Sequence, residues 1–396
     1  MNLFDDISRR AAQIHDEMVR LRRDFHRHPE LGFSEHRTAA KVASYLKNLG
    51  LDVKEGVGGT GVVGLLRGGS PGGTVMLRSD MDALPIQEKT SVPYRSENPG
   101  VMHACGHDGH MAILLGTATV LAGIARSIRG QVKFVLQPAE EGLGGASRMI
   151  EDGVLDDPEV NAAFGLHLIT ALPCGTVGWG NGTLMAAMDY FVLRIKGRSG
   201  HSSMPQEGVD AILASARVIE GLQSLNRTAD GSSPGSLINI GTIRGGDASN
   251  VIAEEVELTG TVRTLEPEVR TAMPSSIEGI VGKAVKGIGA DFELYYHQGY
   301  PPVVNDEDLT GLMRRTAGEI LGADRLFELP PLMASEDMAF YLQKVPGCLF
   351  FLGAGNPEKG LTNPLHSSTF DFDESALATG ATLLASLALA WFDRWG

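Results

Sequence analysis

The stretch TVMLRSDMD, residues 74–82, is an apolar run that ends in two acidic side chains, Asp80 and Asp82. Three later runs have the same form and also lead to chemically reactive residues. They are QVKFVLQ (131–137) before Glu140 and Glu141, AAFGLHL (162–168) with His167, and CLFFLGAG (348–355) before His366. Helix-like stretches such as MAILLGTATVLAGIA (111–125) lie between them. Strands that alternate with helices are typical of an α/β domain with a mostly parallel sheet, and such sheets bind ligands at the carboxyl ends of their strands.

The pattern changes between Thr183 and Gln298, where the order becomes strand, helix, strand, strand, helix, strand. The segments are DYFVLRIKG (189–197), DAILASARVIEGLQSL (210–225), SLINIGTIRG (236–245), EEVELTGTVRT (254–264), EPEVRTAMPSSIEGIVGKAV (266–285) and DFELYYH (291–297). This βαββαβ order is that of the ferredoxin-like α+β sandwich. We therefore expect a second domain, residues 183–298, inserted into a catalytic domain made of residues 1–182 and 299–396.

Composition restricts the class of protein and its partners. The chain has 396 residues, of which 43% are hydrophobic and 21% are charged, and this is ordinary for a folded protein of two domains. A formal net charge of -14, without any run of Lys or Arg, argues against nucleic acid as a partner. The apolar tract ATLLASLALAWF (381–392) is shorter than a membrane span, so we expect a buried helix and no membrane partner.

The first residues and the cysteines give an expectation about the compartment. MNLFDDISRR (1–10) has early acidic residues and no apolar core, so we expect no signal peptide. Cys105, Cys174 and Cys348 are too few and too widely spaced for a disulfide framework. Both features favour a cytoplasmic protein.

The stretch GVGGTG, residues 56–61, satisfies the G-x-G-x-x-G pattern of dinucleotide-binding proteins. The β-like sequence VVGLL follows it, however, where a helix would have to begin in order to bind a pyrophosphate. A hairpin turn is the better interpretation.

The residues of MHACGHDGHMA (102–112) are rich in metal-ligand types. Cys105 and His107 precede an apparent helix, and taken alone they are as well explained by a buried cysteine and a helix-capping histidine. Glu141, His167 and His366 follow or lie in separate β-runs, and thiolate, imidazole and carboxylate together are transition-metal ligands. Five candidates exceed the needs of one tetrahedral zinc with an open position, so we predict two metal ions with Cys105 or a water as a bridge.

The acidic pair in QPAEEG (137–142) follows an apolar strand at the ligand-binding edge. On an ordinary surface loop such a pair is only a solvated acidic turn. At this position one carboxylate can bind metal while its neighbour takes a proton from water, so we assign Glu141 as a ligand and Glu140 as the general base. His26, His28, His103 and His110 are interpreted as structural.

Nine stretches, in order over nearly the whole chain, resemble signatures of the zinc-dependent aminoacylase and carboxypeptidase family. The resemblance is to its amidohydrolase branch, which contains hippurate hydrolases, N-acyl-amino-acid deacylases and plant auxin-conjugate hydrolases. The stretches are RRDFHRHPELGFSE (22–35), RSDMDALPIQE (78–88), MHACGHDGHMA (102–112), QPAEEG (137–142), GLHL (165–168), GRSGHSSMPQEGVDA (197–211), SNVIAEEVELTGTVRT (249–264), SEDMAFYL (335–342) and NPLHSSTFDFDE (363–374).

The resemblance implies a di-metal catalytic domain interrupted by a smaller lid or dimerisation domain, and hence a homodimer or higher homo-oligomer. The implied cofactors are two divalent ions, zinc or manganese, with cobalt or nickel also compatible with these ligands. The implied ligands and base are those assigned above: Cys105, His107, Glu141, His167, His366 and the base Glu140. Asp82 would orient a metal ligand without binding the metal itself. Asp80 lies where relatives outside this branch have a histidine.

Three residues of the inserted domain also receive roles from the resemblance. His201 would stabilise the tetrahedral oxyanion, in some relatives from a partner subunit, while Asn250 and Arg263 would hold the substrate carboxylate. Each has a simpler explanation, since histidine caps helices, asparagine suits turns and arginine on a strand is often solvated.

These assignments predict metal-assisted hydrolysis of the amide bond of an N-acyl amino acid, giving a carboxylic acid and a free amino acid. Glu140 would take a proton from the attacking water and return it to the leaving amine. Two alternatives remain: a dipeptidase or carboxypeptidase of the same family, and a non-catalytic protein that binds metal or a metabolite.

Overall fold

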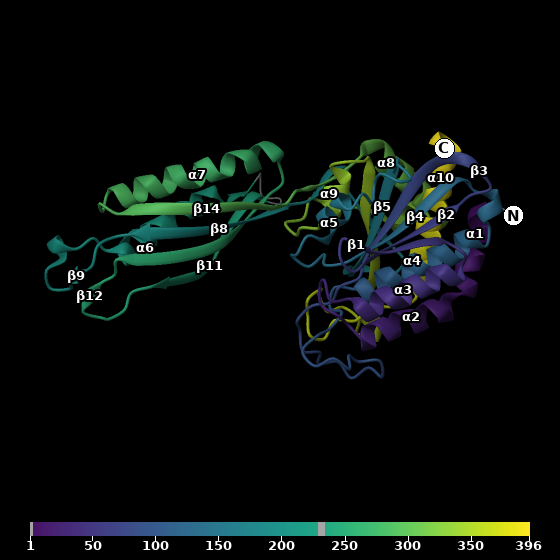
Figure 1. Cartoon of the computed structure of the whole chain (residues 1–396), viewed down its shortest axis with the longest axis horizontal. Helices are drawn as coiled ribbons and strands as arrows, with labels where there is room; N and C mark the ends of the chain where they lie inside the picture. The colour runs from purple at the N-terminus through teal and green to yellow at the C-terminus, as the bar shows by residue number, and fades with distance from the viewer. Residues whose placement is uncertain (1–2, 229–233) are drawn as a thin grey trace. The chain divides into compact units, whose positions relative to one another are not determined.

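The computed structural model describes residues 3–228 and 234–396, and the chain divides into two compact units (Figure 1). The first unit comprises residues 1–182, 304–329 and 337–396; the second comprises residues 183–303 and 330–336. The second unit begins where the sequence places it but ends at Val303 instead of Gln298, since its last strand continues to Tyr300. It also takes in 330–336, because the Ala186 N–H lies 2.9 Å from the carbonyl oxygens of both Leu332 and Ala334.

The first unit is built on an eight-stranded sheet with strand order β1-β2-β4-β3-β5-β17-β6-β16. Its strands are β1 (Asp52–Val57), β2 (Gly61–Arg67), β3 (Ser70–Asp80), β4 (Arg129–Gln137), β5 (Ala162–Pro173), β6 (Val177–Trp179), β16 (Leu326–Glu328) and β17 (Gly347–Gly355). The central strands β4, β3, β5 and β17 are parallel, whereas β1, β2 and the β6–β17 pair are antiparallel. The predicted mostly parallel α/β sheet is confirmed.

Helices cover both faces of this sheet. They are α1 (Leu3–Gln13), α2 (His15–Arg27), α3 (His36–Asn48), α4 (His107–Ala122), α5 (Gly145–Glu151), α8 (Glu307–Leu321), α9 (Met338–Leu342) and α10 (Ala376–Trp395). Side chains alternate along a strand, so Val132 and Phe134 of β4 join the main core beneath α4 and α10, while Lys133 faces the other way. The Lys133 ammonium is buried and donates to the carbonyl oxygens of Val154 and Pro158, beyond α5.

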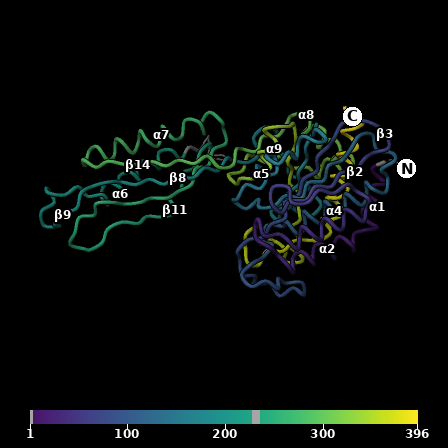
Figure 2. The backbone as a smooth tube through the Cα atoms, in the orientation of Figure 1, coloured from purple at the N-terminus to yellow at the C-terminus, as the bar shows by residue number. Residues whose placement is uncertain are grey.

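The two ends of the first unit meet in one core. The backbone trace shows the N-terminal helices beside the C-terminal helix α10, and α1 and α2 both contact it (Figure 2). Within the described residues, α10 is the helix whose length and composition would allow it to cross a membrane, and 78% of its apolar window is buried in the structure. This agrees with the predicted buried terminal helix.

The second unit is a five-stranded antiparallel sheet with strand order β10-β11-β13-β8-β14 (Figure 1). Its strands are β8 (Ala187–Lys196), β10 (Arg227–Thr228), β11 (Pro234–Gly245), β13 (Glu255–Thr264) and β14 (Asp291–Tyr300). The helices α6 (Ala211–Leu222) and α7 (Pro267–Lys286) lie side by side and pack on one face, over a core that includes Leu193, Val218 and Ile277. The predicted βαββαβ order is confirmed.

The glycine-rich stretch 56–61 joins β1 to β2, which pair as an antiparallel hairpin through Val57 and Gly61. Gly58 and Gly59 have φ values of 66° and 105°, which favour glycine. The stretch is therefore a hairpin turn, as predicted, and it does not precede a helix.

Candidate metal and active site

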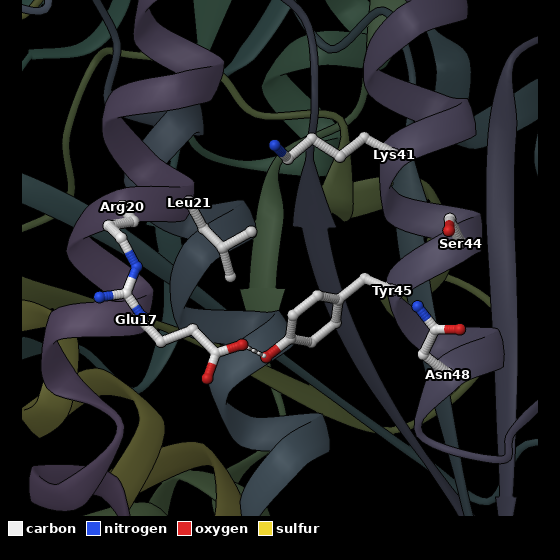
Figure 3. Close-up of a pocket in the computed structure, with 7 residues that line it drawn as sticks. All are labelled: Glu17, Arg20, Leu21, Lys41, Ser44, Tyr45 and Asn48. Carbon is white, nitrogen blue, oxygen red and sulfur yellow. Dashed lines mark hydrogen bonds between the residues drawn. The ribbon is translucent and has the colours of Figure 1, made fainter.

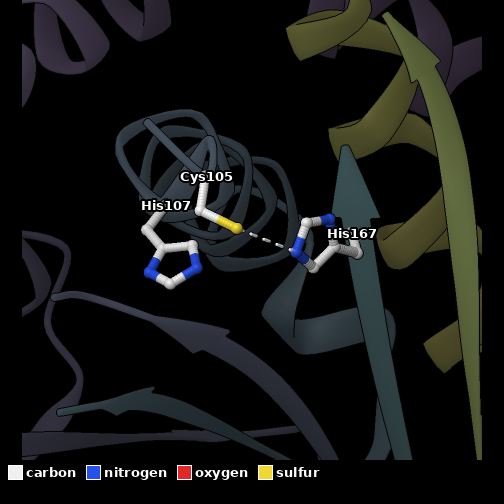
Figure 4. Close-up of side chains that lie close together, drawn as sticks. All are labelled: Cys105, His107 and His167. Carbon is white, nitrogen blue, oxygen red and sulfur yellow. Dashed lines mark hydrogen bonds between the residues drawn. The ribbon is translucent and has the colours of Figure 1, made fainter. Parts of the chain in front are cut away.

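The five predicted metal ligands lie together in the first unit. Cys105 and His107 lie at the start of α4 and are separated by Gly106. The φ of Gly106 is 87°, a left-handed value that favours glycine. Five groups of three side chains among the described residues have ligand atoms within 4.8 Å of one another, and two of them consist of predicted ligands alone: Cys105 with His107 and His167, and Cys105 with Glu141 and His366. Figure 4 shows the first set, in which Cys105 Sγ lies 3.6 Å from His167 Nε2. Cys105 belongs to both sets, so it is positioned to bridge two ions.

Backbone carbonyls orient the rings of His107 and His167. His107 Nδ1 lies 2.8 Å from the carbonyl oxygen of Asp82, and His167 Nδ1 lies 2.8 Å from that of Leu168. A carbonyl only accepts, so each Nδ1 carries the proton and each Nε2 has a lone pair for a metal. His167 belongs to β5 rather than following it, but it lies beyond Gly165, the last β5 residue in the ladder with β3.

Glu141 and His366 complete the second set. Glu141 Oε1 lies 3.3 Å from His366 Nε2, and the backbone N–H of His366 donates to the Ala104 carbonyl at 2.7 Å. Hydrogen bonds to Cys105 and Glu141 raise the pKa of His366 to about 10, while burial raises the pKa of the Cys105 thiol. A metal ion binding here would displace these protons.

One atom of the set, His107 Nε2, is buried without a hydrogen-bond partner among the described residues, and the buried Glu141 Oε1 lies 3.9 Å from it. An unpaired buried polar atom is costly, and one that faces a thiol, a carboxylate and further imidazoles is suited to bind a cation. The residues present therefore fit two divalent metal ions.

Two buried carboxylates hold the loop that carries Glu140 and Glu141. Asp82 accepts the backbone N–H groups of both residues at 3.0 Å, one with each carboxylate oxygen. The carboxylate of Glu35 accepts the preceding N–H, that of Ala139, at 2.9 Å. Ala139 has φ 55°, an unfavourable value for a residue with a side chain, so this contact fixes a strained turn. Asp82 thus orients Glu141 through its backbone and His107 through its own carbonyl.

The Glu140 carboxylate lies beside the backbone of Asp337, whose N–H is 3.4 Å from Glu140 Oε1. Asp337 is fixed by Arg78 Nη2 at 2.8 Å and by Gln137 Nε2 at 2.7 Å, all three being buried. The predicted base is therefore held next to a predicted ligand on a rigid support.

His110 and Asp80 lie next to the ligand set, but their side-chain atoms already have hydrogen-bond partners within the protein. His110 accepts the Leu168 N–H at Nε2, 2.8 Å away, and therefore donates from Nδ1 to Asp80 Oδ1 at 2.7 Å. The other Asp80 oxygen accepts from Arg78 Nη1 at 2.9 Å. Burial raises the pKa of Asp80, but the adjacent His107, His110 and Arg78 side chains outweigh it and hold that pKa well below its usual value. The structural interpretation of His110 agrees with these contacts.

The structure separates the three predicted site residues of the second unit. His201 in β9 (Gly200–His201) pairs with Val251 of β12 (Val251–Ile252), so it lies next to Asn250 beyond one end of the sheet. Arg263 pairs with Met188 near the other end of β13, roughly 25 Å along the strand from Glu255 at about 3.3 Å per residue. The three residues therefore do not lie together at one end of the sheet.

The contacts of His201 and Arg263 indicate what each can do. His201 Nδ1 accepts the Ser203 N–H at 3.1 Å, which leaves the proton of the neutral ring on Nε2 as a free donor. Arg263 Nη1 donates to the Met333 carbonyl at 2.8 Å, and burial lowers the pKa of its guanidinium. Each is an available donor for an anionic group.

A separate groove of about 420 Å³ opens on the surface between α2 and α3 (Figure 3). Its lining residues are Glu17, Arg20, Leu21, Lys41, Ser44, Tyr45 and Asn48. The Tyr45 hydroxyl donates to Glu17 at 2.9 Å, and none of the predicted site residues lines this groove.

Sequence reasoning missed the supporting residues Glu35, Arg78 and Asp337. Each lies in a stretch that carries the resemblance, within 22–35, 78–88 and 335–342, so the motifs contained the signal. Arg78 carried a second signal, since a charged residue near the end of an apolar strand needs buried partners.

This geometry belongs to a known class of protein. Residues 76–390 match the model of peptidase family M20/M25/M40, and the chain belongs to that family of metal-dependent hydrolases.

Individual relatives cover almost the full chain. A thermostable carboxypeptidase 1 of Saccharolobus solfataricus is 38% identical over 100% of both chains. An N-acetyl-L-cysteine deacetylase of Bacillus subtilis is 35% identical over 96% of this chain and 90% of its own. The crystal structure of the Bacillus subtilis YXEP protein, described as a dinuclear metal binding peptidase, is 34% identical with a TM-score of 0.85, covering 96% of this chain and 99% of its own.

Proposed function

We propose that this protein is an amidohydrolase that cleaves N-acyl amino acids into a carboxylic acid and a free amino acid. The observation that carries the proposal is the pairing of a two-ion ligand set, centred on Cys105, with the adjacent carboxylate of Glu140. A protein that only stored metal would have no use for a carboxylate held beside the ligands. The similarity to a deacetylase of N-acetyl-L-cysteine supports the same reaction class.

Cys105, His107, Glu141, His167 and His366 would hold the two ions, with Cys105 shared between them. Bound there, two divalent cations would supply Lewis-acid polarisation of the amide carbonyl and acidification of water. Glu140 takes the proton of the attacking water and delivers it to the nitrogen of the leaving amino acid. Its position beside the Asp337 N–H holds the carboxylate while that proton is moved.

The second unit supplies the remaining groups. The Nε2–H of His201 is suited to the oxyanion that forms on the acyl carbon, and Asn250 lies beside it. The Arg263 guanidinium is suited to the carboxylate of the amino acid. Because His201 and Asn250 lie at the other end of the sheet from Arg263, we assign the two groups to different active sites of a homodimer.

The test is a hydrolysis screen of the purified protein, stripped of metal and reloaded in parallel with zinc, manganese, cobalt or nickel. Hippurate, N-acetyl amino acids and the corresponding amino acid amides serve as substrates. The proposal expects metal-dependent release of the free amino acid and poor cleavage when the carboxylate is amidated. Absence of metal-dependent turnover on every acyl amino acid, in protein that binds two ions, would contradict it.

Carboxypeptidase activity is the second candidate, favoured by the thermostable carboxypeptidase among the relatives. Its chemistry would use the same residues, since a peptide is an N-acyl amino acid whose acyl group is itself a peptide. Adding dipeptides and longer peptides to the screen separates the two: faster release of C-terminal residues than of amino acids from simple acyl derivatives identifies a carboxypeptidase.

A further inference from the structure

A fully buried arginine, Arg22 of α2, contacts two segments that carry predicted metal ligands. Its guanidinium makes three ion pairs: Nε with Asp108 at 2.8 Å, Nη2 with Asp371 at 2.6 Å and Nη1 with Glu374 at 3.2 Å. Asp108 is distant in sequence from Asp371 and Glu374, so one cation joins two separate parts of the chain.

The first partner, Asp108, belongs to the turn that carries two predicted ligands. It follows His107 directly, in the first turn of α4, where a carboxylate is favoured by the helix dipole. His26 Nδ1 also lies 2.8 Å from the Asp108 oxygen that Arg22 binds. The start of α4 is therefore anchored to α2 at two adjacent points.

The other two partners belong to the segment 363–374, which carries His366. The Arg22 guanidinium also packs against two aromatic rings, 4.4 Å from the centroid of Phe372 and 4.8 Å from that of Tyr94. The Tyr94 hydroxyl donates to the second Asp371 oxygen at 2.8 Å. A planar cation that donates from several edges and packs against two aromatic rings has little freedom to shift.

Close packing brings the two parts of the chain together near Arg22. A Cβ atom on Gly109 would lie 2.6 Å from Phe372 Cζ, so the ring touches the α4 backbone where only glycine leaves room. The His366 N–H reaches the Ala104 carbonyl at 2.7 Å. Two further hydrogen bonds hold the segment on either side of His366: the Lys89 N–H donates to the Ser368 carbonyl at 2.8 Å, and the Thr170 hydroxyl donates to the Asn363 carbonyl at 2.8 Å. Phe372 and Arg22 hold it farther along the chain, where it packs against α4.

The two metal-ligand sets depend unequally on this arrangement. His107 and His167 are oriented by the carbonyls of Asp82 and Leu168, which Arg22 does not touch. The His366 side chain is 53% exposed and lies outside any helix or strand, so its position depends on the contacts of its segment.

We propose that Arg22 is a positioning residue that holds the His366 segment at the correct distance from the Cys105–His107 turn. It would thereby control the affinity of the ion held by Cys105, Glu141 and His366 more than that of the ion held by Cys105, His107 and His167. This inference rests on the two-ion site of the proposed function.

The test compares Arg22→Lys with a matched control, Arg23→Met. Lysine keeps the buried charge but cannot reach three carboxylates at once. Arg23 is 43% exposed on the same helix, pairs with Glu374 at 2.6 Å and lies 4.7 Å from the centroid of the Tyr94 ring, so its loss leaves the contacts of Arg22 with Asp108 and Asp371 in place. Asp371→Asn is the second variant, because it weakens the same link from the other side and leaves Arg22 with two carboxylate partners. For each protein, competition with a chelator measures the two metal dissociation constants, and the cobalt form reports the thiolate–metal absorption of Cys105.

We expect Arg22→Lys and Asp371→Asn to weaken the affinity for one ion by roughly 10–100-fold, a typical loss for an outer-shell partner of a metal site, while the other ion binds nearly as before. Arg23→Met should retain both affinities. The thermal midpoint of the metal-free protein is measured in parallel, since a purely structural role would lower this midpoint and weaken both ions together.

Equal loss of both ions, or two unchanged affinities in Arg22→Lys and Asp371→Asn, would overturn the inference. Its failure is distinguishable from failure of the proposed function. If the wild-type protein binds two ions but hydrolyses no acyl amino acid, the proposed function is disproved. The metal affinities of the variants then still test the role of Arg22. A wild-type protein that binds fewer than two ions disproves both.

Discussion

The predicted catalytic residues of the two units differ in how the chain holds them. In the first unit, Glu140 and Glu141 sit on a loop whose N–H groups are bound by the buried Asp82, and the rings of the ligands are oriented by carbonyls. In the second unit, His201 is exposed, and among the described residues its Nδ1 contacts only Ser203, two residues away.

A single copy of the chain can therefore position the catalytic groups of the first unit by itself. Preorganisation requires that the groups around a side chain fix its rotamer, and the first unit meets that condition with buried polar contacts. At His201 the described residues provide only a local turn, which fixes the tautomer but not the position of the ring relative to a substrate. The predictions below test whether the first unit is complete and whether the second needs another copy of the chain.

The largest effect is expected for Glu140→Gln, which keeps the shape of the base and removes its ability to take a proton. Turnover should fall by roughly 10²–10⁴-fold while both ions and the substrate still bind. Initial rates at saturating substrate, together with metal analysis of the same sample, measure it. Near-normal turnover in folded, metal-loaded protein would remove Glu140 from the mechanism.

The next effect is expected for His201→Ala, which removes the Nε2–H donor assigned to the oxyanion. The turnover number should fall by roughly 10²–10³-fold with little change in metal content. Mixing this variant with Glu140→Gln tests the homodimer, since a hybrid would contain one site with both residues intact. Recovered activity supports action across subunits; no recovery despite demonstrated subunit exchange would show that His201 acts within its own chain or not at all.

A smaller loss of turnover is expected for Cys105→Ser, because added metal can compensate for a weaker ligand. A hydroxyl is a poorer anionic ligand than a thiolate, and Cys105 belongs to both ligand sets, so occupancy of both ions should decrease. Cys174→Ser is the matched control, since that half-buried thiol contacts Ser375 and Asp373, away from the ligands. Two tightly held ions in Cys105→Ser would mean that the thiol is only structural.

The sequence predicted the ligand types and their convergence because both depend on local features. An apolar run ending in His167 or before Glu141 places those residues at one edge of a parallel sheet, and this follows from strand order alone. The structure also bears out the hairpin at 56–61 and the buried α10.

The supporting contacts could not be predicted in the same way, because they join residues distant in sequence. Glu35 reaches Ala139, and Arg22 reaches Asp371, through chain reversals that no periodicity encodes. The separation of His201 and Asn250 from Arg263 could not be predicted for a related reason. The motifs mark which residues matter, but the antiparallel register decides at which end of the sheet each one lies.

The smallest effect is expected for Glu35→Gln, which tests how firmly the first unit holds its base. Burial raises the pKa of Glu35, and the opposing hydrogen bond from Thr60 does not cancel that shift. A carboxyl whose pKa is higher in the folded state is favoured when protonated, so its stabilising contribution is present at low pH and is lost as the pH rises through the raised pKa. Glutamine imitates the neutral acid and still accepts the Ala139 N–H.

Urea unfolding of the metal-free proteins from roughly pH 4 to pH 8 measures this effect. As the pH rises above the ordinary pKa of a glutamate, the free energy of unfolding of Glu35→Gln should increase relative to that of the wild type. The difference between the two free energies should stop growing above the raised pKa of Glu35. Turnover should change little, because the loop before Glu140 keeps its hydrogen bond.

Glu35→Ala is the control. It leaves the Ala139 N–H buried and unpaired, which costs roughly 1–3 kcal/mol and frees the strained turn, so it should lower turnover as well. A stability gap that shrinks with rising pH would show instead that Glu35 is held as a carboxylate, and that the loop bearing the base depends on its charge.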